Sequence, residues 1–366
     1  MSIGAFTHDA VGGRVVFGAG SRRALADEVA ALGGTRVVLI ASADEDALAV
    51  ELSELLGERR VTRFADVVQH VPVARAAAAS ALVDECEADC IVTLGGGSAT
   101  GFGKAVRLAR AESGRDRTLA FVAVPTTYAG SEMTTIWGRT DGDHKHTGKH
   151  PYVKPDTVVY DPELTRSLPA RIAGPSGMNA LAHCVEALYG PGHNPIVDLH
   201  ALEGVRALAA GLPLVCGDGD SIEARGDALY GAYLAGIALA SGGTALHHKT
   251  CHVLGGMFNL NHGDMNSVVL GHAVAYNAAA MPDVMERLGV ALGVAPDGVP
   301  GALFDLAAAI GAPTSLAAIG MPADGIPEAA RRVVAEASAN VRTPDQASIE
   351  RMLTEAFHGS RPEVFT

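Results

Sequence analysis

Two histidines at helical spacing and a third shortly after them are the residues most suited to chemistry in this sequence. His248 and His252 lie four residues apart in an apolar-rich run, so a helix over residues 244–254 places both imidazoles on one face. Because glycine accepts the left-handed conformation of a helix end, the helix is predicted to stop at residues 255–256, and His262 follows in a polar loop. This pattern predicts one site, although partly buried histidines bonded at a helix junction would look the same.

A second helix is predicted to present another pair of polar side chains in the same way. Ser176 is expected to cap a helix that ends near Tyr189, and Asn179 and His183 share one face of it at a spacing of four. Asn179 also stands three residues after Ser176, where an amide can complete a helix cap. The pair therefore indicates either a second contribution to the histidine site or a structural cap.

A glycine-rich turn earlier in the chain is typical of a phosphate-binding loop. It lies directly after an apolar strand at residues 89–94 and before a helix at residues 99–109. Without side chains the backbone can approach a diphosphate, whose charge is met by free N–H groups at the helix start. A tight turn without a ligand has the same composition, and the segment is not the G-x-G-x-x-G of an ordinary dinucleotide fold. The candidate cofactor residues here are Gly95, Gly96, Gly97 and Ser98.

Two other turns at strand ends are expected to contact the same cofactor. A strand at residues 119–124 leads into residues 125–132, where hydroxyl and N–H groups are concentrated and could contact a nicotinamide or form a capped turn. The strand at residues 35–41 is followed by acidic residues, and one that reached the ribose would disfavour the 2′-phosphate of NADPH. The pattern leaves the choice between NADH and NADPH open. The candidates in these turns are Thr126, Thr127, Ser131 and Ser42.

A loop at residues 138–151 concentrates positive charge in an acidic protein. It contains Lys145, Lys149 and three histidines. Such a loop is predicted to hold an anionic substrate, because charge-assisted hydrogen bonds favour carboxylates. A solvated surface loop would have the same composition.

The order of the predicted elements indicates two domains. Continuous apolar strands alternate with helices in the first half, which is typical of a doubly wound parallel sheet and predicts an α/β dinucleotide-binding domain over residues 1–163. From residue 171 onward strand-like runs disappear, so residues 164–366 are expected to form an all-α domain. The active site is expected in the cleft between the two domains.

Composition excludes several classes of partner. The formal net charge of the 366 residues is −13, which repels nucleic acid and anionic membranes, and no apolar run approaches the roughly 20 residues expected of a bilayer span. The first residues lack the features of a signal peptide, so a cytoplasmic protein acting on a small molecule is expected. Five cysteines form neither a disulfide framework nor a zinc pattern.

Taken together, the motifs resemble the iron-containing alcohol dehydrogenase superfamily, and most closely its maleylacetate reductases. The resemblance covers nearly the whole chain in order. In the iron-dependent members it places an aspartate ligand at Asn179 and an aspartate of the glycine-rich motif at Gly101. A neutral amide binds a hard divalent cation more weakly than a carboxylate does, so no metal is expected here. The shared motifs are GGGS-x5-K at 95–104, PTTYAGSE at 125–132, N-x3-H at 179–183, H-x3-H at 248–252 and His262.

The resemblance implies reduction of the carbon–carbon double bond of 2-maleylacetate by NADH or NADPH, giving 3-oxoadipate during breakdown of aromatic compounds, by a homodimer. Hydride addition to an enone creates an enolate, which needs hydrogen-bond donors and then a proton. His252 is assigned as the general acid, with His248 and His183 as donors. The remaining residues expected to bind this small dicarboxylate are Lys145, Lys149, Tyr128, Asn179, His262 and Arg342.

Three other functions are compatible with parts of the pattern. A metal-dependent alcohol or polyol dehydrogenase would hold Fe²⁺ or Zn²⁺ on His183, His248 and His262, since three imidazoles can bind a catalytic zinc. A nucleotide sensor without turnover would not need the histidines. A lyase similar to dehydroquinate synthase would need its metal, and Asn179 lacks the carboxylate for it.

Overall fold

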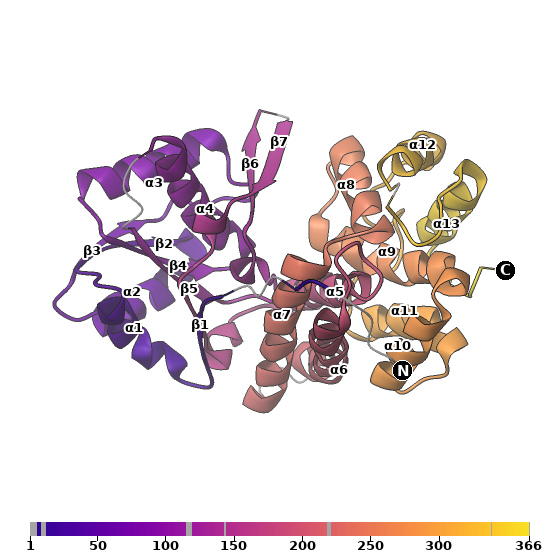
Figure 1. Ribbon diagram of the computed structural model, residues 1–366, viewed down its shortest axis with the longest axis horizontal. Helices are drawn as coiled ribbons and strands as arrows, with labels where there is room; N and C mark the ends of the chain where they lie inside the picture. Colours follow the sequence, from indigo (N-terminus) through magenta and orange to yellow (C-terminus); the bar gives the residue numbers. More distant parts are fainter. Residues whose placement is uncertain are drawn as a thin grey trace. The chain divides into compact units, whose positions relative to one another are not determined.

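A computed structural model describes residues 6–8, 12–114, 119–142, 144–217, 221–337 and 339–365. The chain divides into two compact units (Figure 1). Val11–Leu168 forms the first, here called the sheet unit, and Pro169–Thr366, grouped with Met1–Ala10, forms the second, here called the helical unit. The predicted boundary at residue 163 and the predicted position of the active site between the domains stay predictions.

The sheet unit contains a six-stranded parallel sheet, as predicted. Its strand order is β1-β8-β5-β4-β2-β3, so the chain winds outward from β2 to β3 and then resumes on the other side with β4. Ligands of open parallel sheets bind where the strand order reverses in this way, outside the carboxyl ends of the strands. The strands are β1 (Arg14–Phe17), β2 (Arg36–Ala41), β3 (Arg60–Phe64), β4 (Cys90–Gly95), β5 (Ala120–Pro125) and β8 (Thr157–Tyr160).

Both faces of the central strands are buried, which explains their continuous apolar sequences. Alternate side chains of β2, β4 and β5, such as Leu39 and Val92, pack on one face against α1 and α2. On the other face the chain crosses through α3 and α4, and Gly103 of α4 lies against Phe121 of β5. The helices of this unit are α1 (Leu25–Ala31), α2 (Asp46–Leu55), α3 (Val73–Glu85) and α4 (Gly97–Glu112).

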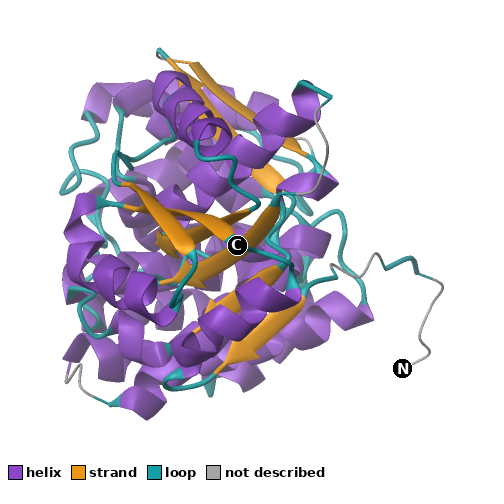
Figure 2. Cartoon of the chain, turned by 90° about the vertical axis from the view of Figure 1, so that its left-hand side faces the viewer, coloured by secondary structure: helices purple, strands orange, loops and turns teal. Residues whose placement is uncertain are grey.

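The segment predicted as a cationic loop is instead an antiparallel hairpin, β6 (Ile136–Asp141) and β7 (His144–Lys149). Figure 2 shows it as a pair of strands apart from the sheet. Trp137 pairs with Gly148, and a Cβ on that glycine would stand 2.6 Å from the indole ring, so glycine is needed for the strands to pair. The sequence did not predict these strands because they are mostly polar and lack an alternating apolar pattern. Their pairing depends on the partner strand and not on an apolar face.

All elements that the structure describes after residue 169 are helical, as predicted. A core of side chains from α8, α9, α12 and α13 holds the C-terminal half of this unit together. The helices are α5 (Ala170–Ala187), α6 (Pro195–Gly217), α7 (Ile222–Gly242), α8 (Leu246–Phe258), α9 (His262–Asn277), α10 (Pro282–Leu292), α11 (Val299–Ala309), α12 (Ile326–Glu336) and α13 (Gln346–His358).

Three predictions about these helices are wrong. Helix α5 begins at Ala170 and contains Pro175, so Ser176 lies inside the helix and is not its N-cap residue. Helix α8 runs through residues 255–256 because Gly255 faces Met265 of α9, where an added Cβ would stand 3.0 Å from the methionine. It ends instead at Asn259, which has a positive φ of 52°. As a result His262 does not lie in a loop but begins α9.

Contrary to expectation, one helix of the described residues is long and apolar enough to cross a membrane by length and composition alone. It is α6, and two bent pairs of helices would add up to two more spans if each pair were one span. In this structure α6 packs along α5 and α7. It also carries Asp198, whose carboxylate forms an ion pair with the guanidinium of Arg287 in α10, with a nitrogen–oxygen distance of 2.6 Å. Small and apolar residues thus give this helix its hydropathy while its inner face packs within the unit.

Candidate active site

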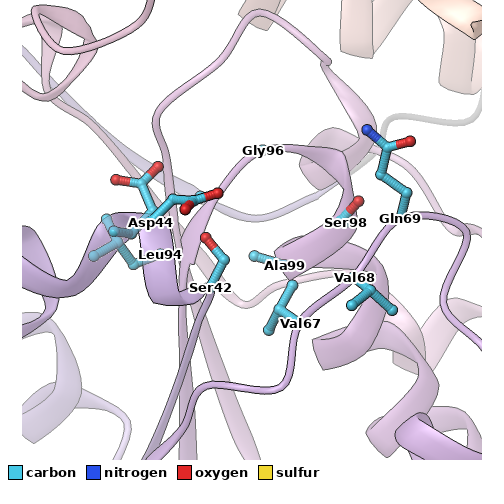
Figure 3. Close-up of a pocket in the computed structure, with 11 residues that line it drawn as sticks. Ser42, Asp44, Val67, Val68, Gln69, Leu94, Gly96, Ser98 and Ala99 are labelled. Atoms are coloured by element: carbon cyan, nitrogen blue, oxygen red, sulfur yellow. The ribbon is translucent and has the colours of Figure 1, made fainter.

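A cavity of about 350 Å³ lies at the carboxyl ends of β2, β3 and β4 in the sheet unit (Figure 3). This is the point where the strand order reverses. Its wall has three parts, one after each strand. They are Ser42, Asp44 and Glu45 after β2, Val67, Val68 and Gln69 after β3, and Leu94, Gly95, Gly96, Ser98 and Ala99 at the end of β4 and the start of α4.

The glycine-rich turn forms the floor of this cavity. Gly95 has a φ of 135°, a conformation that side chains disfavour, and α4 begins at Gly97. Helix α4 has 16 residues, and its first N–H groups, which have no acceptor within the helix, lie at the turn that lines the cavity. A Cβ on Gly96 would stand 2.8 Å from the Thr127 side chain, so the turn has no room for one. This cradle fits the diphosphate of a dinucleotide.

Replacing Gly96 with valine is expected to raise the dissociation constant for NADH at least about tenfold, equivalent to about 1.4 kcal/mol. The added side chain would collide with Thr127 and occupy the approach to the helix N-terminus. Isothermal titration calorimetry on folded protein measures the effect. Gly217→Val is the matched control, since among the described residues no atom outside its own stretch of helix lies within 4 Å of a Cβ added there. Unchanged NADH affinity in the Gly96 variant would reject the cradle.

The other predicted cofactor residues support the cavity in different ways. Ser42 lines it directly. Thr126 is buried and donates its hydroxyl to Glu45 at 2.8 Å, and Thr127 packs on Gly96. Ser131 offers its backbone carbonyl to Lys104 and lies outside the cavity wall. Thus four of the predicted cofactor residues, Ser42, Gly95, Gly96 and Ser98, are part of the cavity wall, whereas Gly97 is not, and the two threonines contact the wall from behind.

Lys104, the lysine of the GGGS-x5-K motif, is fully buried and does not face the cavity. Its ammonium donates to the carbonyl oxygens of Ser131 at 2.7 Å, Thr134 at 2.9 Å and Ile136 at 2.6 Å. Burial lowers the pKa of Lys104 to about 7. The side chain thereby fixes the turn between β5 and the β6–β7 hairpin to helix α4.

The predicted substrate cations lie in different places. Lys149 is exposed at the end of β7, and Lys145 lies on the same strand. Arg342 is in the helical unit, where it donates to the carbonyl of Tyr276 at 2.9 Å and covers the ring of that tyrosine at 4.3 Å. Tyr128 is fully buried in the turn after β5. The roles of all four in substrate binding stay predictions.

The predicted histidines come together within the helical unit. His183 of α5 stacks on His248 of α8, with ring centroids 4.3 Å apart and planes 14° from parallel. His252 and His262 complete the group, with ring centroids 6.5 Å apart. The ring centroid of His248 lies 6.4 Å from that of His252 and 6.3 Å from that of His262. Asn179 points its amide nitrogen at Nε2 of His183, 3.3 Å away. Three helices therefore build one cluster.

Two residues that the sequence did not indicate, Glu186 and His247, hold the cluster in place through hydrogen bonds. Glu186 is fully buried, and one of its oxygens accepts from Nδ1 of His248 at 2.6 Å. Its other oxygen accepts the N–H of His247 at 2.7 Å, at the start of α8. His247 bonds the carbonyl of Asn266 through Nε2. Glu186 lies three residues after His183 and seven after Asn179, so helical periodicity alone could have found it.

These bonds determine which nitrogen of His248 carries the proton. When Glu186 is ionised it accepts at Nδ1 of His248, which places the hydrogen there and leaves a lone pair on Nε2, although burial raises the pKa of Glu186. Burial lowers the pKa of His248 well below its usual 6.5, which keeps the ring neutral. In this tautomer His248 is an acceptor, which differs from the donor role predicted for it. Burial also lowers the pKa of His183 and lowers that of His247 to about 4.

Three buried polar atoms of the cluster have no hydrogen-bond partner among the described residues. They are Oδ1 of Asn179, Nδ1 of His183 and Nε2 of His248. Buried polar atoms of folded proteins are nearly always satisfied, so these mark a place for a ligand or water. His252 is exposed and His262 half-buried, which leaves this end of the cluster accessible.

Asn179 and the histidines of the cluster are neutral ligands, which bind a hard divalent cation more weakly than carboxylates do. Nε2 of His183 also faces the Asn179 amide. Glu186, His247 and His248 lie near one another, but the carboxylate stands only 2.6 Å from the His248 nitrogen, a direct hydrogen bond that leaves no space for an ion.

Comparison with known proteins identifies the family. The iron-containing alcohol dehydrogenase model matches residues 12–162, and the C-terminal model of the Fe-containing alcohol dehydrogenase family matches residues 174–357. Maleylacetate reductases of Sphingobium indicum and Burkholderia cepacia are each 46% identical, covering 98% of this chain and 99% of theirs. The crystal structure of maleylacetate reductase from Agrobacterium tumefaciens matches with a TM-score of 0.92 at 39% identity, over 98% of this chain and 100% of that one. The chain is an oxidoreductase that belongs to the iron-containing alcohol dehydrogenase family, in its maleylacetate reductase branch.

Proposed function

We propose that this protein reduces the carbon–carbon double bond of 2-maleylacetate with a reduced nicotinamide dinucleotide and a proton, giving 3-oxoadipate and the oxidised dinucleotide. The observation that carries the proposal is full-length identity of 40–46% to several maleylacetate reductases, combined with the neutral Asn179 beside His183 in the histidine cluster. The breakdown of aromatic compounds is the process in which such a reaction belongs.

The bound dinucleotide supplies the hydride, and the cavity of the sheet unit is the proposed place for its diphosphate. Gly95, Gly96 and the start of α4 hold that group through backbone N–H donors. Among the acidic residues after β2, Glu45 is occupied by Thr126 and Asp46 pairs with Arg63. Asp44 is exposed, lines the cavity and forms neither of these pairs. It is the carboxylate we assign to the ribose hydroxyls, which favours NADH over NADPH.

Replacing Asp44 with asparagine is expected to lower the ratio of the NADPH Kd to the NADH Kd by about tenfold, because like charges at a binding surface oppose association. Titration of both dinucleotides against the unsubstituted and the variant protein gives the ratio. Asp46→Asn is the matched control, since it removes a carboxylate two residues away that pairs with Arg63. A ratio that falls equally in both variants would show a general charge effect and reject the assignment.

In the proposed mechanism the histidine cluster serves the enone. As hydride adds to one carbon of the double bond, negative charge develops on the ketone oxygen and must meet a donor. Nδ1 of His183 is the proposed donor, because the Asn179 amide engages Nε2 and leaves Nδ1 without a partner. His248 holds the His183 ring in place by stacking. His252, which is exposed and can exchange protons with solvent, then protonates the neighbouring carbon.

The two carboxylates of the substrate need cations or donors. Lys149 and Lys145 on β7 are proposed for them, and Tyr128, His262 and Arg342 remain further candidates for substrate contact. The basis of this assignment is their positive charge, because a charge-assisted hydrogen bond to a carboxylate contributes on the order of 1.5–3 kcal/mol.

We also propose that the protein is a cytoplasmic homodimer. Size-exclusion chromatography coupled to light scattering measures the mass of the particle and so tests whether it is a dimer.

One assay tests the proposed function. Consumption of NADH is followed at fixed enzyme with 2-maleylacetate, before and after dialysis against a chelator, alongside metal analysis of the same sample. We expect turnover that survives chelation and less than about 0.1 equivalent of iron or zinc, because neutral ligands hold a hard cation weakly. Activity lost on chelation and restored by one divalent ion would instead indicate a metal-dependent alcohol or polyol dehydrogenase.

A further inference from the structure

One wall of the cofactor cavity is followed by a strained turn. Residues 67–69 line the cavity on the side of β3, and Figure 3 shows Val67 and Val68 near Ala99 of α4. The next two residues, His70 and Val71, have φ angles of 66° and 50°. A β-branched side chain rarely adopts this conformation, so the surrounding structure must enforce it at Val71.

Contacts from two sides enforce the conformation. Val71 is 5% exposed, and its side chain fills the space above Gly101, where an added Cβ would stand 2.7 Å from Cγ2 of the valine. On the other side Thr140 of β6 donates its N–H to the carbonyl of Val71 at 3.1 Å and its hydroxyl to that of His70 at 2.9 Å. Val71 is therefore held between helix α4 and the hairpin.

We infer that Val71 is a positioning residue for cofactor binding, and that Gly101 is the notch that receives it. Three peptide units separate Val71 from Val68, so a shift of the valine side chain displaces the cavity wall directly. The same helix α4 supplies the diphosphate cradle through Gly97 and Ser98 and the notch through Gly101, one turn later. The width of the cavity is thus set by how closely Val71 approaches α4. This inference rests on the proposed cofactor site.

The test is a double-mutant cycle on NADH binding. Gly101→Ala is expected to raise the NADH Kd about tenfold, because the methyl group pushes Val71 and the wall away from α4, although alanine is the better helix former. Val71→Ala alone is expected to raise the Kd at least about threefold, because the emptied notch no longer holds the wall in place, and combining it with Gly101→Ala, whose methyl group fills the notch, should restore the Kd to within about twofold of the unsubstituted protein. The KM for 2-maleylacetate at saturating NADH should stay unchanged in all three variants.

Gly103→Ala is the matched control. It places the same methyl group on the same helix, but against Phe121 and Thr93 in the sheet at 2.5 Å and 2.7 Å. It should lower Tm without raising the NADH Kd of the folded protein. An equal rise in Kd for Gly103→Ala, or no rescue by Val71→Ala, would overturn the inference while leaving the cofactor site intact. An unsubstituted protein that binds neither NADH nor NADPH would overturn the proposed function together with it.

Discussion

Replacing His252 with alanine is expected to lower kcat with 2-maleylacetate by about 10²- to 10⁴-fold, the usual contribution of a positioned general acid. His252 is the exposed member of the cluster, on the face of α8 that it shares with His248. The neighbouring buried rings are kept neutral, since burial lowers the pKa values of His183 and His248. They are poor proton sources at neutral pH, so the proton for carbon must come from elsewhere.

Steady-state kinetics with the Ala variant, together with its NADH Kd, measures this effect. The Kd should change less than twofold, because His252 belongs to the helical unit and not to the cavity wall. His193→Ala is the matched control: that histidine is also exposed in the helical unit and lies 3.4 Å from Asp198, outside the cluster. A kcat within threefold of the unsubstituted enzyme would assign the proton donor to another group or to water.

Substitution of Glu186 by leucine is expected to cost about 3–5 kcal/mol of unfolding free energy. The carboxylate is fully buried and accepts from Nδ1 of His248 and from the N–H groups of His247 and His248. Leucine would leave these donors buried without partners, at about 1–3 kcal/mol each. Differential scanning calorimetry should show a Tm lower by roughly 10 °C for a unit of this size.

Glu186→Gln separates the structural role of this residue from its effect on tautomer. Its amide oxygen can still accept the N–H of His247, so much of the stability should return. Its amide nitrogen cannot accept from Nδ1 of His248, which forces the imidazole hydrogen onto Nε2. We expect the Gln variant to lose kcat by about tenfold or more at near-normal Tm. If both variants kept the Tm and kcat of the unsubstituted protein, Glu186 would have neither role.

Local sequence was sufficient for the features that depend on local rules. The continuous apolar runs predicted parallel strands covered on both faces, and the glycines of the turn after β4 predicted a cradle at a helix start. Helical spacing placed His248 and His252 on one face, and Asn179 and His183 on another. The family motifs then indicated which of these faces belong to one site.

Features that depend on distant partners were missed. Gly255 looked like a helix end, but close packing on Met265 decides that α8 continues. The tautomer of His248 depends on Glu186, 62 residues away, so its acceptor role could not be predicted from spacing. The hairpin needed Gly148 opposite Trp137, and Val71 needed the notch at Gly101. In three of these four cases a glycine is explained only by the side chain that lies across from it.

The packing of Trp137 on the hairpin gives the protein a built-in spectroscopic reporter. It is the single tryptophan of the chain. Its ring lies beside Gly148 and within 5.3 Å of the Arg139 guanidinium, and its strand neighbour Ile136 pairs with Lys149. Excitation at the tryptophan band therefore yields emission from one place only, the strand pair that carries the proposed carboxylate-binding lysines. Emission that shifts with a dicarboxylate in the absence of nucleotide reports on this hairpin, whereas energy transfer to bound NADH reports on the nucleotide.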